Sequence, residues 1–425
     1  MSRTYHRFAG QYISEAYANV RDSVDGMEPA YGDRFHDDTA AIQRAIDTRR
    51  HVLFPKGVVL DGGEVGAYVV GTPLVFSHEG QRCTFLAGAF LRLDDAGTVT
   101  INARSQTFTG LKISAGTSTT TTSHLAEPDP CLLIENADGL LLEDVHVESS
   151  HQSTLVRVVN TDGITIQGGR INGSGAVHLE PTLNVGLDLG TGVKNLSAVS
   201  LAIDNTGHGV VFTGATEAIS FVDCTIEQQS EDMILVQESA AVRGLNVIGL
   251  HTEAGSGAYR KIVVEHGGGV YGGVFAGCQF GNLNEDTSEV GRVFDIDGDW
   301  WGVTVRGCSH VTEGDVIWLL GWFANVRDSC DLFNHWDKVV VVTGPRAGDL
   351  PIVQNELGAL SLTANKIRIE ASKIGFFEAR PTARSYTYTV GFEHSRTLTP
   401  GSVRMVLASL LRDLADLGLI KCEVR

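Results

Sequence analysis

Four acidic side chains at related positions of successive repeats are the strongest candidates for chemistry in this sequence. Glu238 and Glu265 each follow a short apolar run, and Asp295 and Asp297 flank Ile296 in a third run. If Ile296 points inward, both aspartates point outward, because side chains at i and i+2 share one face of a strand. Glu265 then lies about one strand spacing away, roughly 4.8 Å, and Glu238 lies about two away.

Two carboxylates at such separations suit the cleavage of a glycosidic bond. Retaining hydrolases place them about 5–5.5 Å apart, and inverting ones about 6.5–9.5 Å apart. Asp295, Asp297 and Asp299 also fit a calcium-dependent lyase site, with Arg292 as the base. The alternative is a solvated acidic face, which an acidic protein displays without any activity.

Four of the five tryptophans crowd the same region of the sequence: Trp300, Trp301, Trp318 and Trp322. Indole rings offer broad apolar faces with one polar atom, which suits them to stack on sugar rings. We therefore expect a sugar-binding platform beside the carboxylates. The alternative is aromatic packing near the end of the repeats.

A second acidic set occupies matching positions on three successive repeats: Asp204, Glu227 and Glu253. The polar residues nearby are His208, Glu231, Asp232, Tyr259 and Arg260. The segments that individually resemble motifs of polygalacturonase-type hydrolases are Asn160–Gly163, Gly207–Gly209, Glu231–Asp232 and Arg260–Lys261. The resemblance is incomplete, because the Gly-His-Gly precedes the acidic pair and Asn160–Gly163 also fits an ordinary turn.

No metal ion or other cofactor is expected. The 14 histidines include no His-x-x-x-His pair and the seven cysteines no Cys-x-x-Cys pair, so the sequence does not support a zinc site. The glycine-rich segment Gly267–Gly273 is expected to allow close backbone passage rather than to hold a phosphate.

These residues are positioned by a repeated phrase of apolar residues. The phrase consists of apolar-x-apolar, two intervening residues, and then a small or apolar residue followed by x-apolar. It recurs at intervals of roughly 22 to 35 residues. The copies span residues 140–147, 164–171, 196–203, 219–226, 245–252, 273–280 and 303–310. Alternation predicts strands, and the interruption has the length of a tight bend. About 24 residues accommodate three strands of about five residues with their bends, so stacked repeats predict an all-β, right-handed parallel β-helix.

In this register several small or apolar residues form one inward lane: Val145, Leu201, Cys224, Leu250, Cys278 and Cys308. A register slip of one residue adds Cys330. Metal or redox chemistry is one interpretation of the three cysteines. The other, which we favour, is that soft side chains stack in a dry core.

Composition narrows the class of protein. A chain of 425 residues can bury a large core, and its net charge of −18 disfavours nucleic acid as a partner. The odd number of dispersed cysteines does not predict a disulfide framework. The first residues lack the apolar region of a signal peptide, and no apolar run of about 18 residues predicts a membrane span.

Residues 31–57 predict a helix followed by a strand. Asp38 or Thr39 can cap a helix whose apolar stripe packs on the strand 52–55; the stripe consists of Ala41, Ile42, Ala45 and Ile46. This phrase resembles the opening segment of the pectate-lyase-like β-helix superfamily, in which a capping helix covers the open end of the solenoid. In that superfamily the segment is especially common in bacteriophage tailspikes and tail fibres.

The chain divides by pattern into four parts. Residues 1–30 form an N-terminal attachment segment, 31–335 the capped β-helix, 336–385 terminal strands and 386–425 a strand-helix segment. Residues 117–123 form a polar loop of threonine and serine. The last part resembles the closing segment of phage tail and fibre proteins, and its apolar helix around 403–417 implies a homotrimer. The alternative is a helix folded back on its own solenoid.

The resemblance implies a bacteriophage virion tailspike or tail-fibre protein that binds a host surface polysaccharide, with or without cleaving it. Phage tail or baseplate proteins are its expected partners. The expected location is the phage tail, and the extracellular space after lysis. Two alternatives stay open: a structural or adhesive virion protein without activity, and a bacterial polysaccharide lyase or hydrolase.

Overall fold

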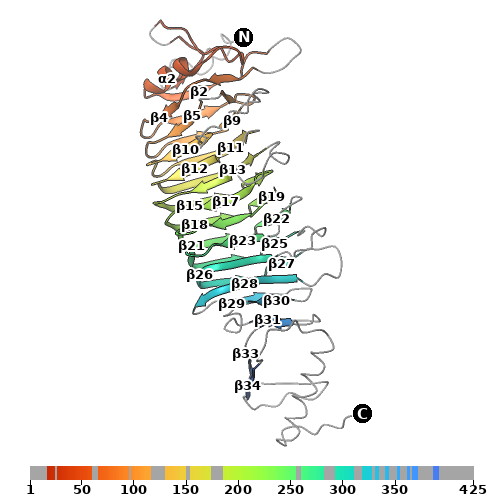
Figure 1. Ribbon diagram of the computed structural model, residues 1–425. Coiled ribbons are helices and arrows are strands. Elements are labelled where there is room, and N and C mark those ends of the chain that lie inside the picture. Colours follow the sequence, from red (N-terminus) through yellow and green to blue (C-terminus); the bar gives the residue numbers. More distant parts are fainter. Residues whose placement is uncertain are drawn as a thin grey trace, which may run out of the picture.

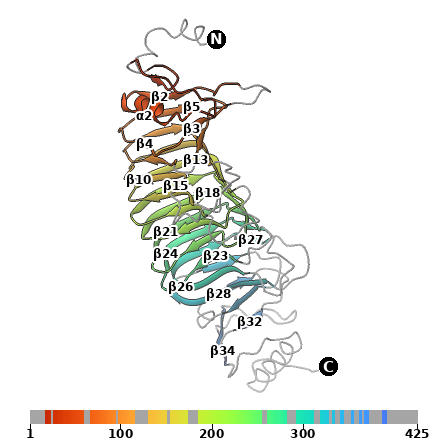
Figure 2. The ribbon, with the colours of Figure 1, turned by 45° about the horizontal axis from the view of Figure 1, so that its top comes forward.

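The computed structural model describes residues 17–23, 26–59, 66–94, 97–115, 130–149, 154–173, 185–254, 260–281 and 292–310, and beyond them the backbone of seven short strands between residues 318 and 391. Thirty-two strands pair in parallel and wind into a right-handed β-helix, a tall stack of coils (Figure 1). The predicted fold class is confirmed. Seen from a tilted direction, each coil follows the outline of the one before it (Figure 2).

The coils contribute to three parallel sheets. Sheet 1 contains β3 (Tyr68–Val70), β6 (Leu91–Leu93), β9 (Lys112–Ala115), the second halves of β11 (Leu141–Ser149) and β13 (Asp162–Asn172), β16 (Ala202–Asp204), β19 (Thr225–Gln229), β22 (His251–Ala254), β25 (Gln279–Phe280) and β27 (Ser309–His310). Sheet 2 contains β4 (Leu74–Phe76), β7 (Val99–Ile101), β10 (Leu132–Glu135), β12 (Thr154–Val159), β14 (Val185–Leu189), β17 (His208–Phe212), β20 (Ile234–Val236), β23 (Arg260–Val264), the first half of β26 (Arg292–Arg306), β28 (Trp318–Arg327), β30 (Val340–Thr343) and β32 (Ser361–Thr363).

Sheet 3 contains β1 (Tyr17–Asn19), β2 (His51–Phe54), β5 (Arg82–Phe85), β8 (Thr107–Thr109), the first halves of β11 and β13, β15 (Val193–Val199), β18 (Thr216–Val222), β21 (Ala241–Ile248), β24 (Gly269–Ala276), the second half of β26, β29 (Asp331–Asn334) and β31 (Ile352–Gln354). A separate antiparallel pair joins β33 (Lys366–Ala371) to β34 (Tyr386–Gly391). Long strands such as β26 turn a corner and belong to two sheets.

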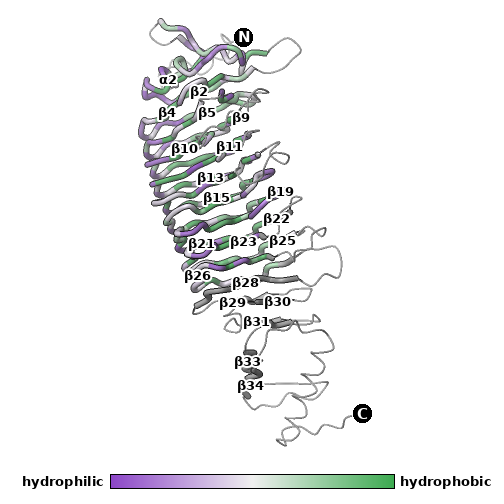
Figure 3. The backbone as a smooth tube through the Cα atoms, in the orientation of Figure 1, coloured by the Kyte–Doolittle hydropathy of each residue, from purple (hydrophilic) through white to green (hydrophobic). Residues whose placement is uncertain are grey.

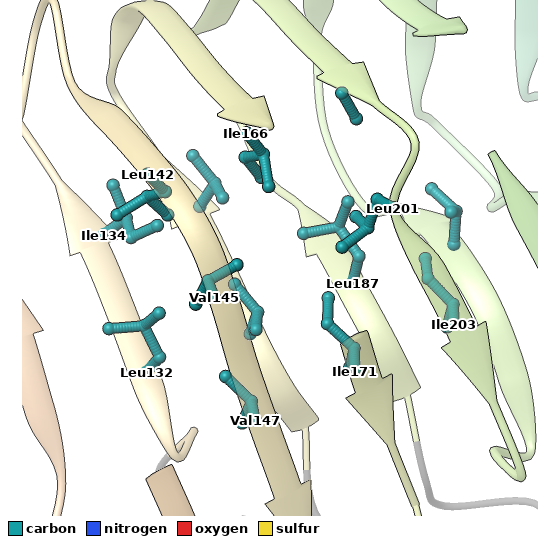
Figure 4. Close-up of a cluster of buried hydrophobic side chains, with 14 of the residues drawn as sticks. Leu132, Ile134, Leu142, Val145, Val147, Ile166, Ile171, Leu187, Leu201 and Ile203 are labelled. Atoms are coloured by element: carbon teal, nitrogen blue, oxygen red, sulfur yellow. The ribbon is translucent and has the colours of Figure 1, made fainter. Parts of the chain in front are cut away.

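The repeated phrase sets the register of the coils. Its second apolar position stacks directly from coil to coil, and the residues in that lane are Leu142, Ile166, Ala198, Phe221, Val247, Phe275 and Val305. All are buried in one continuous core. Figure 4 shows the part of this core that contains Leu142 and Ile166. Apolar and polar residues alternate along the strands (Figure 3), so the inward face is dry while the outward face meets solvent.

The interruption in the phrase is a tight bend between sheet 3 and sheet 1, as predicted. Each of these bends from Gly110 onward has a residue with a positive φ, and the set is Gly110, Asp144, Gly168 with Gly169, Ser200, Asp223, Gly249, Gly277 and Gly307. The bend returns the next apolar residue to the inside. The predicted lane is confirmed by its burial, at 1–2% exposure for Val145, Leu201, Cys224, Leu250, Cys278 and Cys308. Cys330 lies outside the described side chains.

Helix α2 (Thr39–Asp47) covers the open end of the solenoid. Ile42, Ala45 and Ile46 are buried against the first coil and Ala41 packs at their edge, which confirms the predicted stripe. Asp38 occupies the N-cap position without capping the helix through its side chain. Its carboxylate instead accepts backbone N–H groups of the loop at Tyr31 and Gly32 and of Val69 in β3, so it fastens the cap to the coil.

Strand β1 pairs in parallel with β2, so the solenoid begins within the predicted attachment segment 1–30. The rest of that segment before residue 17, the loop 117–123 and the apolar helix predicted around 403–417 lie outside the described residues.

We expect that a substitution at one corner of the solenoid can relieve backbone strain and stabilise the fold. Ala218 has a φ of 55°, in a lane where its neighbours are Asn195 at 50° and Gly244 at 71°. An alanine pays about 1–2 kcal/mol in this conformation, and glycine does not. After the larger chain entropy of glycine is subtracted, Ala218→Gly is expected to raise the free energy of unfolding by about 0.5–1 kcal/mol in chemical denaturation.

The matched control is Ala202→Gly, at a half-buried position within β16. This variant is expected to lower the free energy of unfolding by about 0.5–1 kcal/mol, because it adds chain entropy without relieving strain. Equal signs for the two variants would contradict the strain at Ala218.

Candidate functional site

The structure places the predicted carboxylates on the outside of the solenoid. Ile296 is fully buried, Asp295 is half-buried and Asp297 is exposed, as the alternation predicts. The backbone of Asp295 pairs with Val263, which belongs to a small apolar cluster on the outer face of sheet 2. Asp295 therefore lies on the face of that sheet, beside apolar neighbours.

The other three predicted acids meet at the corner between sheet 2 and sheet 3. Glu265 is level with Asp297 rather than with Asp295, because Val264 pairs with Ile296. The Glu265 carboxylate accepts the backbone N–H of Glu238 at 3.0 Å from the preceding coil. His266 Nδ1 lies 3.9 Å from Asp297 Oδ2.

An aromatic pair flanks these acids where sheet 3 begins. Tyr271 and Trp301 are register partners on neighbouring coils, and their rings meet edge to face with centroids 5.2 Å apart. Both side chains are half-buried, so part of each ring is open to solvent. Tyr271 donates its hydroxyl hydrogen to Asp299 Oδ2 at 3.0 Å. We call Glu238, Glu265, His266, Tyr271, Asp297, Asp299 and Trp301 the acidic–aromatic corner.

Burial and the bond to Asp299 raise the pKa of the Tyr271 hydroxyl above its ordinary value, so it remains a donor at neutral pH. The ring lies over the backbone of Gly269, where a Cβ atom would come within 2.6 Å of the Tyr271 oxygen. The predicted close backbone passage along Gly267–Gly273 is confirmed at Gly268, where a Cβ would lie 2.6 Å from the Gln237 carbonyl oxygen. A Cβ on Gly273 would also lie 2.2 Å from the Leu245 carbonyl oxygen.

The predicted tryptophan platform is only partly assembled. Trp300 is fully buried, stacked on Phe275 at 5.9 Å, so stacking on a surface sugar does not fit this residue. Adjacent side chains of a strand point to opposite faces, so Trp300 faces the core while Trp301 faces outward. The backbone of Trp322 pairs with Asp295 on the preceding coil. The side chains of Trp318 and Trp322 lie outside the described part.

A metal-dependent lyase is not favoured by this corner. Asp299 is engaged by Tyr271, and the Arg292 side chain lies outside the description. Among the described residues, no group of three or more histidine, cysteine, aspartate or glutamate side chains is arranged to hold a metal ion.

The second acidic set also lies as predicted, at the corner between sheet 1 and sheet 2. Asp204 pairs with Glu227, and Glu227 pairs with Glu253, on three successive coils. The Glu227 carboxylate lies 3.5 Å from His251 Nε2, and Asp204 forms an ion pair with Arg170 from the preceding coil. We call this region the buried acidic corner.

Several charged groups in this lane and in the connections beside it are withdrawn from water. Asp204 is 5% exposed, Asp232 is 2% exposed and Lys261 is fully buried. His208 Nδ1 lies 3.6 Å from Asp232 Oδ2. Burying charges costs several kcal/mol per ion unless partners compensate, and here Arg170 pairs with Asp204 while His208 lies beside Asp232.

Three of the four polygalacturonase-like segments lie together, and the fourth lies at another corner. Gly207–Gly209 is hydrogen-bonded to Glu231–Asp232, and Arg260–Lys261 follows on the next coil. Asn160–Gly163 connects β12 to β13 at the corner between sheets 2 and 3, whereas His208 and Asp232 lie between sheets 1 and 2. Asn160 and Gly163 have positive φ angles, 46° and 75°, as an ordinary turn before a coil requires. That resemblance is therefore local.

The sequence pattern did not identify Arg170, His251 and Tyr271 as site residues. Arg170 and His251 sit beside the acidic lane only after coils are aligned, and a single copy of the phrase does not reveal that. Aligning the outward residues of successive coils would have placed Tyr271 next to Trp301, on the preceding coil.

Comparison with known proteins supports the architecture alone. No known protein family and no curated protein matches the sequence. The fold is similar to PfbA, a surface adhesin of Streptococcus pneumoniae, with a TM-score of 0.51 and 11% identity over 81% of this chain and 88% of that chain. The Dettilon tailspike protein gp208 matches with a TM-score of 0.49 and 12% identity over 76% of this chain and 69% of that chain.

A GH87 α-1,3-glucanase from Streptomyces thermodiastaticus matches with a TM-score of 0.42 and 11% identity, over 76% of this chain and 69% of that chain. At 11% identity the likeness to PfbA supports the parallel β-helix fold and nothing beyond it. The described residues contain no helix of the length and apolar character needed to span a membrane.

The packing of Tyr271 on Gly269 generates a testable coupling. Gly269→Ala is expected to lower the free energy of unfolding by about 1–3 kcal/mol, because the new methyl group displaces the tyrosine ring. In a Tyr271→Ala background the same change is expected to cost much less, and a double-mutant cycle by chemical denaturation measures the difference. Additive costs would show that the ring does not lie over Gly269.

Proposed function

We propose that this chain is a bacteriophage tailspike or tail-fibre protein that binds a host surface polysaccharide at the acidic–aromatic corner. The observation that carries the binding site is the half-buried pair Tyr271 and Trp301, flanked by carboxylates from neighbouring coils. Such a pair supplies apolar faces for sugar rings, and the carboxylates supply acceptors for sugar hydroxyl groups.

The corner is suited to a long, repetitive ligand. Its residues come from three successive coils, and the hydrogen-bonded sheets hold them in place before any ligand arrives. A preformed surface loses little conformational entropy on binding, so weak contacts to individual sugars contribute more of their interaction energy to affinity.

Charge favours a particular class of polysaccharide. The chain carries a net charge of −18, and Glu238, Glu265 and Asp297 are exposed at the corner. A polyuronate would be repelled by these carboxylates at low ionic strength. We therefore propose a neutral or amino-sugar polysaccharide as the ligand.

The assignment to a virion rests on the sequence resemblance of residues 31–60 and of the C-terminal segment. A homotrimer, attachment to phage tail or baseplate proteins and a location on the phage tail are proposed on the same ground. Helix α2 is placed as that resemblance implies, over the open end of the solenoid.

Binding by the purified chain to a panel of capsules and lipopolysaccharides from candidate hosts tests the proposal. We expect at least one neutral or amino-sugar polysaccharide to bind, and Trp301→Ala to weaken that binding by about tenfold or more, equivalent to about 1.4 kcal/mol. Titration calorimetry measures the affinity.

Phe35→Ala is the matched control, because Phe35 is an aromatic residue that is 72% exposed on the N-terminal cap. It is expected to bind like the parent chain. Equal losses in both variants would place the sugar away from the corner, and binding of polyuronates alone would contradict the proposed ligand class.

A further inference from the structure

We propose that Cys278 and Cys308 are an oxidisable pair that forms a disulfide between two adjacent coils of the solenoid. Both residues belong to the inward lane at the corner between sheet 3 and sheet 1, and both are free thiols in this structure. The inference does not rest on the proposed function, because it concerns the covalent state of the scaffold.

The first support is the register of the two coils. Gln279 pairs with Ser309 directly after the bend, so the cysteines that precede them lie level on adjacent coils. Each cysteine follows a glycine of positive φ, at 62° in one coil and 58° in the next, so the two bends match. Adjacent parallel strands lie about 4.8 Å apart, within the range of about 4.4–6.8 Å between the Cα atoms of a disulfide.

The second support is the direction of the two side chains. Cys278 Sγ donates to the Val247 carbonyl at 3.4 Å, and Cys308 Sγ donates to the Phe275 carbonyl at 3.6 Å. Val247 and Phe275 are themselves register partners, so the two thiols have equivalent orientations. A hydrogen bond also joins the two thiols to each other. Both cysteines therefore point into the same part of the core, as a bridge requires.

This contact makes the two thiols chemically different. The hydrogen bond from Cys308 lowers the pKa of the Cys278 thiol below its ordinary value. The same bond, together with burial, raises the pKa of the Cys308 thiol. Because thiolates attack disulfide bonds and thiols do not, Cys278 is the group that reacts first.

The oxidant is a small-molecule disulfide of the glutathione type. The Cys278 thiolate attacks one of its sulfurs and releases the first small thiol. The Cys308 thiol then loses its proton and attacks the Cys278 sulfur of the mixed disulfide, which releases the second small thiol. Two protein thiols are oxidised and one small disulfide is reduced to two thiols, so atoms and electrons balance.

No other pair of cysteines in the described part of the chain is placed in this way. Cys224 shares the lane, but Leu201 and Leu250 occupy the coils on either side of it. Two strand spacings, about 9.6 Å, separate it from Cys278, which exceeds the limit of about 7 Å for a bridge. The other described cysteines lie in different lanes, level with residues of other types.

The crosslink would strengthen the part of the solenoid that carries the acidic–aromatic corner. The two cysteines follow directly after β24 and β26, the strands that carry Tyr271 and Trp301. The bridge would close a loop of about 30 residues, and such a crosslink stabilises a fold mainly by restricting its unfolded chain.

The test compares the full chain before and after treatment with excess oxidised glutathione. Because both thiols are 1% exposed, the incubation is made a few degrees below the thermal transition, where coils open transiently. We expect two of the seven thiols to stop reacting with maleimide in denaturant, and peptide mapping without reductant to find Cys278 linked to Cys308. The treated chain is expected to unfold about 5 °C higher, and dithiothreitol is expected to reverse this shift.

Cys278→Ala and Cys308→Ala are each expected to abolish the bridge and the shift that dithiothreitol reverses. Cys224→Ala is the matched control, because Cys224 is 2% exposed in the same lane and its thiol also donates to backbone carbonyls. It is expected to keep both signals, whatever its own stability, since each variant is compared with itself in the two states. Seven reactive thiols in the treated parent chain, a bridge between other cysteines, or an unchanged shift in Cys308→Ala would overturn the assignment.

Discussion

The structure depends on one constraint: every coil must set its inward apolar residues directly on those of the previous coil. A coil alone cannot bury this face, so its stability comes from its neighbours. The lane from Leu142 to Val305 and the lane that includes Cys224, Cys278 and Cys308 satisfy this constraint together. The positive-φ bend at the corner between sheets 3 and 1 is its geometric consequence.

The same constraint determines where function can develop. Inward positions are committed to packing, so a ligand can meet only the outward lanes and the corners between sheets. Register then joins residues far apart in sequence, such as Asp204 with Glu227 and Tyr271 with Trp301. The two candidate corners differ in burial: one exposes its carboxylates beside aromatic rings, and the other withdraws its charges from water.

The sequence predicted the features that depend on periodicity. The coils, the inward cysteines and the outward direction of Asp295 and Asp297 follow from alternation alone. Features that depend on the length of the connections between coils could not be predicted from this alternation. Trp300 could be placed in the core only once β26 was aligned with β24, and the level of Glu265 depended on the pairing of Val264 with Ile296. Asp38 was expected at the cap, yet its bonds to the neighbouring loop depend on tertiary contacts.

We propose that the outer edge beside Tyr271 and Trp301 is a sugar-binding surface on a rigid β-helix. The most direct measurement is a crystal structure of the chain with an oligosaccharide released from a polysaccharide that it binds. We expect sugar rings against Trp301, with hydroxyl groups donating to the carboxylates of Glu238, Glu265 or Asp297. An oligosaccharide bound elsewhere, with this corner left to solvent, would contradict it.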